Sequence, residues 1–560
     1  MKRSFRFTGR RALLLAAAAL LSFVLIQQFL LTSSSSSLSS SGLIPRLARD
    51  LTSFPTSQPS RLSNPSPSAQ AQQKKTEKSA AAEKNVHVEG RADETAENDR
   101  RLRVVKEMMF HAWYGYRNYT WGLNEVRPIS KTSNNQAIFG GEKMAATIID
   151  AADTLWIMGM TTEFEQAREF IVQNFSMKAA TGTLSVFETT IRFVGGLLSL
   201  RALTGQHIFA EKAQEVMSAL LPAFSTPTGI PKSNLDLRTG QAANYGWANG
   251  GSSILAEIGS LHLELVYLSE VTKQPIFAKK AKRIRDALDK VEKVNGGLYS
   301  NYINPNTGKW AGSTHVSVGA LGDSFYEYLI KSWLQSNKKD VQAERMYWDA
   351  SAAIQQKMVS TSRSGLKFVG ELRGGRLERK MGHLACFCVG MFALEAHYEK
   401  NETKRAETMQ LAESLGLTCH ESYVRSKTRI GPEMFYFNDF DDATSKNGEN
   451  GYILRPEVLE GFFYLWRLTK KQMYRDWVWD AISAMNRHCR VDGGFAGLVN
   501  VYQPEQGQDD VQQSFFLAET LKYAYLSFAD ESVLPLSEWV FNTEAHPLPV
   551  LSSLSAASDS

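Results

Sequence analysis

Residues 198–224, LSLRALTGQHIFAEKAQEVMSALLPAF, contain two apolar helical patterns joined by a short turn after Thr204. The same plan returns at residues 263–291 and 462–488. In each copy a first helix ends at a threonine followed by glycine or lysine, and an aromatic residue opens a second amphipathic helix. One helix pair cannot bury its apolar face alone, so repetition at this length indicates stacked helical hairpins.

Glycine-rich stretches follow the second helices. Residues 295–310, 364–375 and 492–501 have hairpin chemistry, because glycine and asparagine supply positive φ values. Stacked helix pairs can form an open solenoid or a closed ring whose inner helices line a cavity. No capping repeat is evident at either end, and the hairpins recur between pairs. We therefore expect an all-α toroid with small β-hairpins between helix pairs, over residues 98–550.

The N-terminus has the pattern of a membrane anchor. Residues 1–11 carry lysine and arginine without any acid, and residues 12–32 carry no charge at all. Such a run can cross a hydrocarbon core of about 30 Å. A cleaved signal peptide is the alternative, but its apolar region is usually only about 7–15 residues long. We expect an uncleaved transmembrane signal-anchor with residues 1–11 in the cytosol and the rest of the chain in a lumen.

The next segment, residues 33–97, is rich first in serine, proline and glutamine and then in alanine, lysine and glutamate. Its apolar content is too low for a packed core, which predicts a flexible lumenal stem. The serine-rich residues 551–560 are expected to form a disordered tail. The net charge of +5 is small for 560 residues and gives no reason to expect a nucleic-acid partner.

Glycosylation sequons support the lumenal location, since they are used only in the secretory pathway. The acceptor residues are Asn118, Asn174 and Asn401. The four cysteines allow three full pairings in an oxidising lumen, and the residues alone do not choose among them. These cysteines are Cys386, Cys388, Cys419 and Cys489. No CxxC pair or His/Cys cluster in the sequence suggests zinc.

Acidic residues stand near the starts of several predicted inner helices. Glu188 and Arg192 are four residues apart on a face that also contains Gly195 and Ser199, as a polar cavity wall would. An ordinary ion pair on a solvated helix would have the same spacing. Glu257 and Glu519 are embedded in apolar helical runs, where a carboxylate is costly without partners.

Three further acids repeat this placement. Asp323 directly precedes an aromatic-rich helix, and Glu433 and Glu457 each follow a proline. Each one alone could simply satisfy free N–H groups and the helix dipole. In a ring, however, inner helices start at the same mouth, so these carboxyls converge and push their pKa values apart. This arrangement indicates glycosidic acid/base chemistry, a cation bound through oxygen, or both.

The C-terminal stretch at residues 539–550, WVFNTEAHPLPV, holds a polar cluster between apolar residues. It is either a loop held down by Val540, Phe541 and Leu548 or a segment that reaches into the site. The second interpretation predicts that Thr543 and its neighbours contribute to the convergent acids.

Together these segments resemble class I α-1,2-mannosidases of glycoside hydrolase family 47. The resemblance covers about residues 104–550 and is carried by SVFETTIRFVGGLLSL (185–200), GDSFYEYLIKSW (322–333), HLACFCVGMFALEAH (383–397), RIGPEMFYF (429–437), YILRPEVLEGFFYLWRLT (452–469), QSFFLAETLKYAYLSF (513–528) and VFNTEAHPLP (540–549). It implies an (α/α)7 barrel, one bound Ca²⁺, and hydrolysis with inversion of terminal α-1,2-linked mannose on high-mannose N-glycans.

The resemblance also implies roles for individual residues. Glu188 would donate a proton through a water, Glu457 would be the base, and Asp323 and Glu433 would complete the catalytic acids. Thr543 would bind calcium through its carbonyl and hydroxyl. The other calcium ligands would be largely waters, held by the carboxylates of Glu257, Glu460, Glu519 and Glu544. The residues expected to contact substrate or neighbouring acids are Arg192, Arg455, Phe515, Leu321 and His383. Cys386 and Cys419 match the disulfide of the family.

Two positions depart from the family pattern. Leu321 stands where endoplasmic-reticulum-type members have arginine and agrees with Golgi-type members that remove several mannoses. Gly382 stands before His383, where an acid is usual. We expect a Golgi membrane protein, with the endoplasmic reticulum as the alternative.

Three other functions compete with this interpretation. A mannose-recognising quality-control factor of the same fold would bind glycans without hydrolysing them, but every acid named above is retained. A toroid glycosidase for another sugar, such as a glucosidase, is disfavoured by the NTEAHP ending. A helical-repeat scaffold would leave the clustered acids without a purpose.

Overall fold

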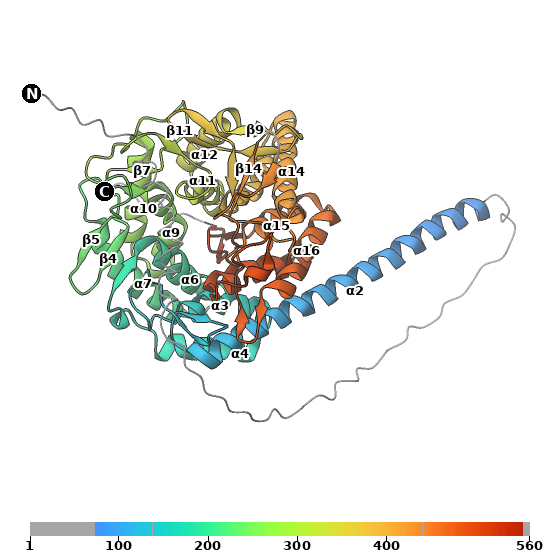
Figure 1. Ribbon diagram of the computed structural model, residues 1–560, viewed down its shortest axis with the longest axis horizontal. Helices are drawn as coiled ribbons and strands as arrows, with labels where there is room; N and C mark the ends of the chain where they lie inside the picture. Colours follow the sequence, from blue (N-terminus) through green and yellow to red (C-terminus); the bar gives the residue numbers. More distant parts are fainter. Residues whose placement is uncertain (1–72, 137, 439–441, 553–560) are drawn as a thin grey trace, which may run out of the picture. The chain divides into compact units, whose positions relative to one another are not determined.

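The computed structural model describes residues 73–136, 138–438 and 442–552 (Figure 1). The chain divides into two compact units, residues 1–92 and 93–560. In the first unit the described part is the beginning of α2 (Gln73–Thr120). Residues 73–97 are therefore helical where a flexible stem was expected, because alanine, lysine and glutamate favour helix even without a core. The expected cytosolic tail and membrane anchor lie outside the described residues.

The described ranges contain no helix that is both long and apolar enough to cross a membrane. At the other end, order extends slightly further than expected. Leu551, the first residue of the expected tail, is buried, and its N–H donates to the carbonyl of Gln335 at 2.7 Å. Residues 553–560 lie outside the described part.

Helix pairs build the second unit. Its inner helices are α3 (Ala146–Ile157), α6 (Gly195–Thr204), α9 (His262–Thr272), α11 (Asp323–Gln335), α13 (Cys388–Tyr398), α15 (Glu457–Thr469) and α17 (Leu521–Phe528). The helices that follow them outside are α4 (Thr161–Gln173), α7 (His207–Leu220), α10 (Ile276–Lys290), α12 (Val341–Lys357), α14 (Glu402–Val424) and α16 (Gln472–His488). Each outer helix packs on the inner helix that precedes it.

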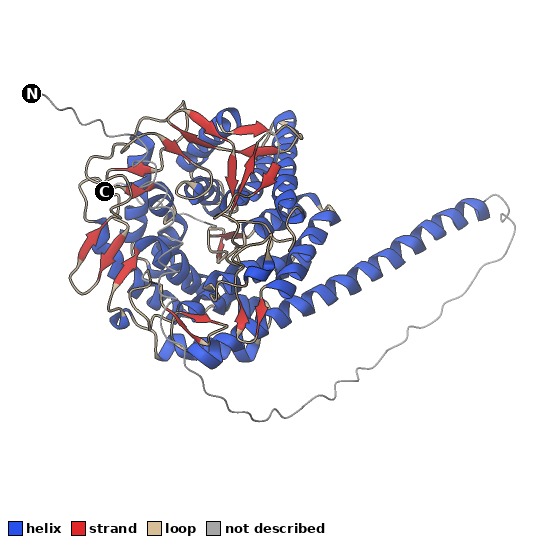
Figure 2. Ribbon diagram, viewed as in Figure 1, coloured by secondary structure: helices blue, strands red, loops and turns tan. Residues whose placement is uncertain are grey.

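The inner helices contact one another in chain order, and the series closes. α3 packs on α6, and the contacts continue through α9, α11, α13 and α15 to α17. The π-helix η6 (Phe516–Thr520), which runs directly into α17, packs back on α3. Figures 1 and 2 show these helices arranged around a common centre. The contacts therefore favour the ring over the open solenoid.

In the three repeats from which the fold was predicted, the first helix ends at the expected threonine. α6, α9 and α15 end at Thr204, Thr272 and Thr469. The next residue has a left-handed backbone in each case, at Gly205 (φ 72°), Lys273 (φ 56°) and Lys470 (φ 60°). A left-handed residue is the common way to stop an α-helix and turn the chain back.

Short antiparallel strands connect the helix pairs (Figure 2). Five described sheets have two strands: β1 (Glu125–Arg127) with β2 (Thr132–Asn134), β6 (Ser253–Ile254) with β7 (Tyr302–Ile303), β9 (Val359–Thr361) with β10 (Lys367–Val369), β16 (Arg490–Val491) with β17 (Gly494–Phe495), and β18 (Trp539–Phe541) with β19 (Pro547–Pro549). Three described sheets have three strands, in the orders β3 (Thr183–Ser185)–β4 (Asn234–Asp236)–β5 (Gln241–Ala243), β8 (His315–Val316)–β11 (Glu371–Arg373)–β12 (Arg376–Glu378), and β13 (Lys380–Gly382)–β14 (Met434–Phe437)–β15 (Asp442–Thr444).

The predicted hairpins are confirmed only in part. Residues 492–501 contribute β17, which pairs with the adjacent β16 as a hairpin. Residues 364–375 hold the glycines of two hairpins: β10 pairs with β9 around Gly365, and β11 pairs with β12 through Gly374 and Gly375. In residues 295–310 an antiparallel bridge joins Ile303 to Trp310, but β7 pairs with the more distant β6. Turn residues alone do not specify which neighbouring segment a strand will reach.

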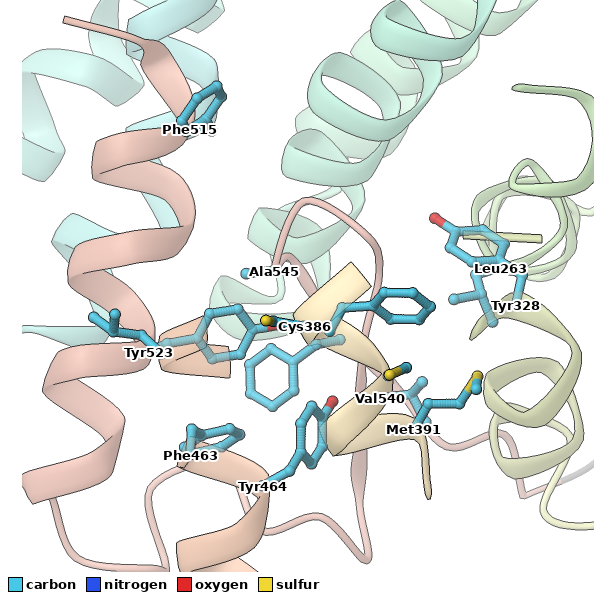
Figure 3. Close-up of a cluster of buried hydrophobic side chains, with 14 of the residues drawn as sticks. Leu263, Tyr328, Cys386, Met391, Phe463, Tyr464, Phe515, Tyr523, Val540 and Ala545 are labelled. Atoms are coloured by element: carbon cyan, nitrogen blue, oxygen red, sulfur yellow. The ribbon is translucent and has the colours of Figure 1, made fainter. Parts of the chain in front are cut away.

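The C-terminal hairpin β18–β19 lies inside the ring. β18 packs on α11 and β19 packs on α6, while the Phe541 ring is 5.7 Å from that of Phe463 in α15 and 5.8 Å from that of Tyr523 in α17. Figure 3 shows Val540 and Ala545 of this segment among apolar side chains from several inner helices. The segment is thus a central plug, as the interpretation of residues 539–550 predicted, and not a surface loop.

Candidate active site

Glu188 and Arg192 form an ion pair at the start of an inner helix. Glu188 ends the short helix α5 (Val186–Glu188), where its N–H donates to the Ser185 hydroxyl at 3.2 Å. Arg192 lies one turn later in the π-helix η2 (Thr189–Val194), with Nε 2.9 Å from Glu188 Oε2. The Arg192 side chain is only 9% exposed, so this is not an ion pair on a solvated helix face.

Arg192 also connects Glu188 to the central plug. Its Nη1 is 3.2 Å from Asp150 Oδ2 of α3 and donates a short hydrogen bond to Glu544, the residue after Thr543. Its guanidinium lies 5.6 Å from the centre of the Phe515 ring. One buried cation therefore gathers carboxylates that are far apart in the sequence.

Glu457 is held by a histidine and an arginine on the other side of the ring. It begins α15 after Pro456, and its Oε2 lies 2.7 Å from His383 Nδ1. Arg455 is 3.9 Å from Glu457 Oε1 and donates to Glu433 Oε2 at 2.7 Å. Burial by itself would raise the pKa of Glu457, but the His383 hydrogen bond and the charges of His383 and Arg455 lower it below its ordinary value. Glu457 is therefore an ionised carboxylate near neutral pH.

Asp323 has the opposite electrostatic environment. It is the first residue of α11, and its Oδ1 accepts the Ser324 N–H at 2.9 Å. Burial raises the pKa of Asp323 to about 7, and the negative charges of Glu327 and Glu457 add to the shift. Asp323 and Glu457 thus influence each other while their pKa values are shifted in opposite directions, the pattern by which an environment separates an acid from a base.

Glu519 links the two halves of this cluster. It lies in the π-helix η6, a type of distortion that is frequent at functional sites. Burial, and then the charges of Glu544, Glu457 and Glu460, raise the pKa of Glu519 well above its ordinary value. The cluster therefore runs continuously from Glu188 to Asp323. Its catalytic candidates keep some solvent contact, with side chains 25% exposed at Glu188, 27% at Glu433 and 12% at Glu457.

Residues 108–550 match the family described as glycosyl hydrolase family 47. This chain belongs to glycosyl hydrolase family 47. The mannosyl-oligosaccharide 1,2-alpha-mannosidase mans-2 of Caenorhabditis elegans is 64% identical over 469 residues, which cover 84% of this chain and 79% of that protein. The mannosyl-oligosaccharide 1,2-alpha-mannosidase IB of Mus musculus is 51% identical over 467 residues, 83% of this chain and 72% of its own.

A solved structure of the family agrees with the fold. The alpha-1,2-mannosidase from Trichoderma reesei superposes with a TM-score of 0.73 at 28% identity, covering 81% of this chain and 99% of that one. The family resemblance inferred from the motifs is therefore confirmed, and so is the helix-rich architecture.

Two of the residues expected to contact substrate, His383 and Leu321, also make contacts that position other parts of the site. His383 is 1% exposed, and its ring nitrogens lie 2.7 Å from Glu457 Oε2 and from the Tyr423 hydroxyl. It therefore lies behind Glu457 and fixes the orientation of that carboxylate. Leu321 keeps partial exposure two residues before Asp323, but its φ is 79° and its carbonyl accepts the Ala256 N–H at 2.9 Å. Leu321 thus also sets the backbone that leads into α11.

Two of the carboxylates expected around calcium have well-defined surroundings. Burial raises the pKa of Glu257 to about 7, and the nearby charge of Glu188 adds to this, so Glu257 lies beside the proposed proton donor. Glu460 Oε1 is 3.6 Å from Lys331 Nζ and 3.3 Å from the Tyr523 hydroxyl. Burial raises the pKa of Glu460 to about 8 even though Lys331 opposes the shift.

The residues around Thr543 fit a hard cation such as Ca²⁺. The Thr543 carbonyl and hydroxyl make no hydrogen bond within the part of the chain that the structure describes, and oxygen is the donor that calcium prefers. A divalent cation would offset the repulsion among carboxyls whose pKa values are raised, namely Asp323, Glu460, Glu519 and Glu544. Within the described ranges no three His, Cys, Asp or Glu side chains could ligate a metal together. The donor set therefore fits a cation held by Thr543 and by waters that carboxylates orient.

Sequence reasoning missed a fully buried charge cluster beneath this site. Asp153 of α3 lies 2.9 Å from Lys522 Nζ and 2.8 Å from His546 Nδ1, and none of these side chains is exposed. The second nitrogen of His546 is 3.4 Å from Asp150. Two features of the sequence could have indicated this cluster. Asp150 and Asp153 lie three residues apart in the largely apolar segment ATIIDAADTLWI, and Lys522 lies in the apolar run of α17.

The cysteines and sequons have clear positions. Cys386 and Cys419 form the expected disulfide, and Cys388 and Cys489 are buried and unpaired. The acceptor asparagines are all exposed: Asn118 near the end of α2, Asn174 after α4 and Asn401 before α14. Their glycosylation stays a prediction.

Proposed function

We propose that this chain is an inverting, calcium-dependent glycosidase that removes terminal α-1,2-linked mannose from high-mannose N-glycans during glycoprotein maturation. The observation that carries the proposal is one partly exposed cluster of acids in which the pKa of Glu457 is lowered and the pKa of Asp323 is raised to about 7. The printed names of the relatives from Caenorhabditis elegans and Mus musculus support the substrate class. A quality-control factor without hydrolysis would not need this pair.

Glu457 is the base in the proposed mechanism. Its carboxylate takes a proton from the water that attacks the anomeric carbon, and His383 and Arg455 hold it ionised and in place. In inverting enzymes the two carboxyls stand about 6.5–9.5 Å apart, which leaves room for this water. The attack occurs from the face opposite the departing sugar, so the configuration inverts.

Glu188 would donate the proton to the departing oxygen through a water, as the family resemblance implies; one of its carboxylate oxygens pairs with Arg192, and the other can hold this water. Asp323, whose pKa is raised to about 7, is proposed as the store from which this proton is supplied. Thr543 and the carboxylates near it would hold the calcium. When bound, Ca²⁺ supplies a positive field and ligand positions for sugar hydroxyls and the attacking water. Phe515, beside Arg192, would stack on the sugar ring.

The finer architecture and the cellular location belong to the same proposal. The closed series of inner helices supports an (α/α)7 barrel. The uncharged run at residues 12–32 supports a single-pass type II membrane protein, and the exposed sequon asparagines agree with a lumenal catalytic domain. Leu321, in place of arginine, supports a Golgi enzyme over an endoplasmic-reticulum one.

The first prediction is the activity itself. The full-length chain, purified in a mild detergent, is expected to release mannose from a nine-mannose N-glycan in the presence of Ca²⁺ and to stop when a chelator is added. Product masses follow the trimming, and NMR identifies the first anomer, which should be β-mannose. Absence of release with calcium would overturn the enzyme assignment. Initial α-mannose would overturn inversion, and release unaffected by the chelator would overturn the calcium requirement.

The second prediction concerns pH. Asp323 donates only while protonated, and its pKa is raised to about 7. Activity is therefore expected to persist below pH 7 and to fall as the pH rises above it, since kcat/KM reports the ionisation of the free enzyme. The profile is measured from pH 5 to 9 at saturating Ca²⁺. An alkaline limb that stays flat to pH 9 would show that Asp323 is not the proton store.

A further inference from the structure

The turn between β18 and β19 is organised by one side chain, that of Asn542. Its backbone N–H donates to the His546 carbonyl at 3.0 Å, and its carbonyl accepts the Ala545 N–H at 3.1 Å. Its side-chain Oδ1 accepts the N–H groups of Glu544 at 2.9 Å and of His546 at 2.8 Å. The turn therefore closes around the Asn542 amide oxygen.

The amide nitrogen of Asn542 ties this turn to two other elements. Nδ2 donates to the Ile191 carbonyl in η2 at 2.9 Å and to Glu264 Oε1 in α9 at 2.8 Å. An asparagine amide can accept two and donate two hydrogen bonds, so the side chain is saturated. Asn542 is fully buried, and Gly195 makes room for it, because a Cβ at Gly195 would stand 2.5 Å from Nδ2. Gly195 at the start of α6 is thus explained by this close approach, whereas a Cβ at Gly196 would meet the Ile149 carbonyl and the His546 ring.

Asn542 makes hydrogen bonds to every other residue of the turn but none to Thr543. Thr543 keeps its carbonyl and hydroxyl free of hydrogen bonds within the described residues, while both of its neighbours are anchored. Ile191, which Asn542 holds, is next to Arg192, the partner of Glu188. One amide therefore fixes the position of Thr543 relative to the segment that carries the proposed proton donor.

We propose that Asn542 is a positioning residue that sets the Thr543 turn in register with η2, so that Thr543 presents its oxygens to Ca²⁺ at the place where Glu188 and Arg192 act. This inference rests on the proposed calcium site. Asn542 itself contacts neither the sugar nor the ion and acts through the backbone of its neighbours.

The test compares calcium affinity in three forms of the full-length chain. Asn542→Asp keeps the acceptor oxygen for the two N–H groups but places a carboxylate oxygen against Glu264 and the Ile191 carbonyl. Glu264→Gln in the same chain restores a donor facing residue 542 and returns the net charge to that of the parent. Isothermal titration with CaCl₂ gives each Kd, and thermal unfolding without calcium reports the stability of each variant.

We expect Asn542→Asp to weaken calcium binding by about tenfold or more, and the double variant to recover most of this loss through the exchanged hydrogen bond. The direction is diagnostic, because an added negative charge alone would strengthen binding of a cation. Asn124→Asp is the matched control: Asn124 is also buried and bridges the Gly141 carbonyl and the Met144 N–H. It should lower the unfolding temperature without changing the calcium Kd by more than about twofold.

The outcomes separate the two proposals. If the parent chain binds no calcium, the metal site of the proposed function fails. If the parent binds calcium and Asn542→Asp binds it equally well or more tightly, the positioning role is wrong. A loss of affinity that Asn124→Asp reproduces, or that the double variant does not recover, would likewise reduce Asn542 to an ordinary contributor to stability.

Discussion

Replacing Glu457 with glutamine is expected to lower kcat for mannose release by about 10³–10⁴-fold while KM changes little, which is the upper part of the range for loss of a general base. Glutamine preserves the volume and can still accept from His383, whose Nδ1 lies 2.7 Å from the Glu457 carboxylate. What is lost is the capacity to take a proton from water. Initial rates on the nine-mannose glycan, with mass spectrometry of the products, give kcat and KM.

A buried glutamate away from the site provides the control for this variant. Glu395 of α13 accepts hydrogen bonds from Tyr347 at 2.9 Å and from Ser351 at 2.5 Å, and it has no contact with the acids around Asp323. Glu395→Gln should change kcat by less than about threefold, because it affects packing and not proton transfer. If Glu457→Gln kept more than a tenth of the parent kcat, Glu457 would not be the base, and Glu433 would be the next candidate.

The positions of the candidate acids could be predicted because they follow from local chemistry. Pro456 fixes the start of α15, so Glu457 has to lie in a first turn, and Asp323 begins α11 in the same way. Once the repeat indicated a ring, first-turn acids from different repeats had to meet at one mouth. The fold was equally accessible, because the same helix pair with a threonine at the end of its first helix recurs at Thr204, Thr272 and Thr469.

Features that depend on which elements meet in space could not be predicted in this way. The sequence shows a histidine before the disulfide cysteine, but only the packing shows that His383 stands behind Glu457 with both ring nitrogens engaged. Strand partners of the glycine-rich stretches also depend on tertiary contacts. For residues 73–97 the low apolar content excluded a core, but it did not exclude the helix that the structure describes there.

The buried charge cluster under the plug gives the largest expected effect on stability. Lys522→Met should lower the free energy of unfolding by about 3–5 kcal/mol, because it removes the lysine charge from a buried carboxylate that then faces His546 and the Ser199 hydroxyl. Lys522 and Asp153 are both fully buried at 2.9 Å, and the Lys522 ammonium also donates to the Ala545 carbonyl of the plug at 2.7 Å. Burial by itself would raise the pKa of Asp153, but Lys522 and His546 lower it to about 2. The measurement is urea unfolding followed by tryptophan fluorescence.

Two further variants test whether the loss in Lys522→Met comes from an uncompensated buried charge or from the loss of an ion-pair contact. In Asp153→Asn with Lys522→Met neither charge remains, so at least half of the loss should be recovered, since the uncompensated carboxylate causes most of it. Lys427→Met breaks an ion pair of similar length, 3.3 Å to Glu505, in which both side chains are 63% exposed. That change should leave the free energy of unfolding almost unchanged, because water already screens the pair. If Lys522→Met were as mild as Lys427→Met, the cluster would not anchor the plug, and Thr543 would have to be held by the Asn542 contacts alone.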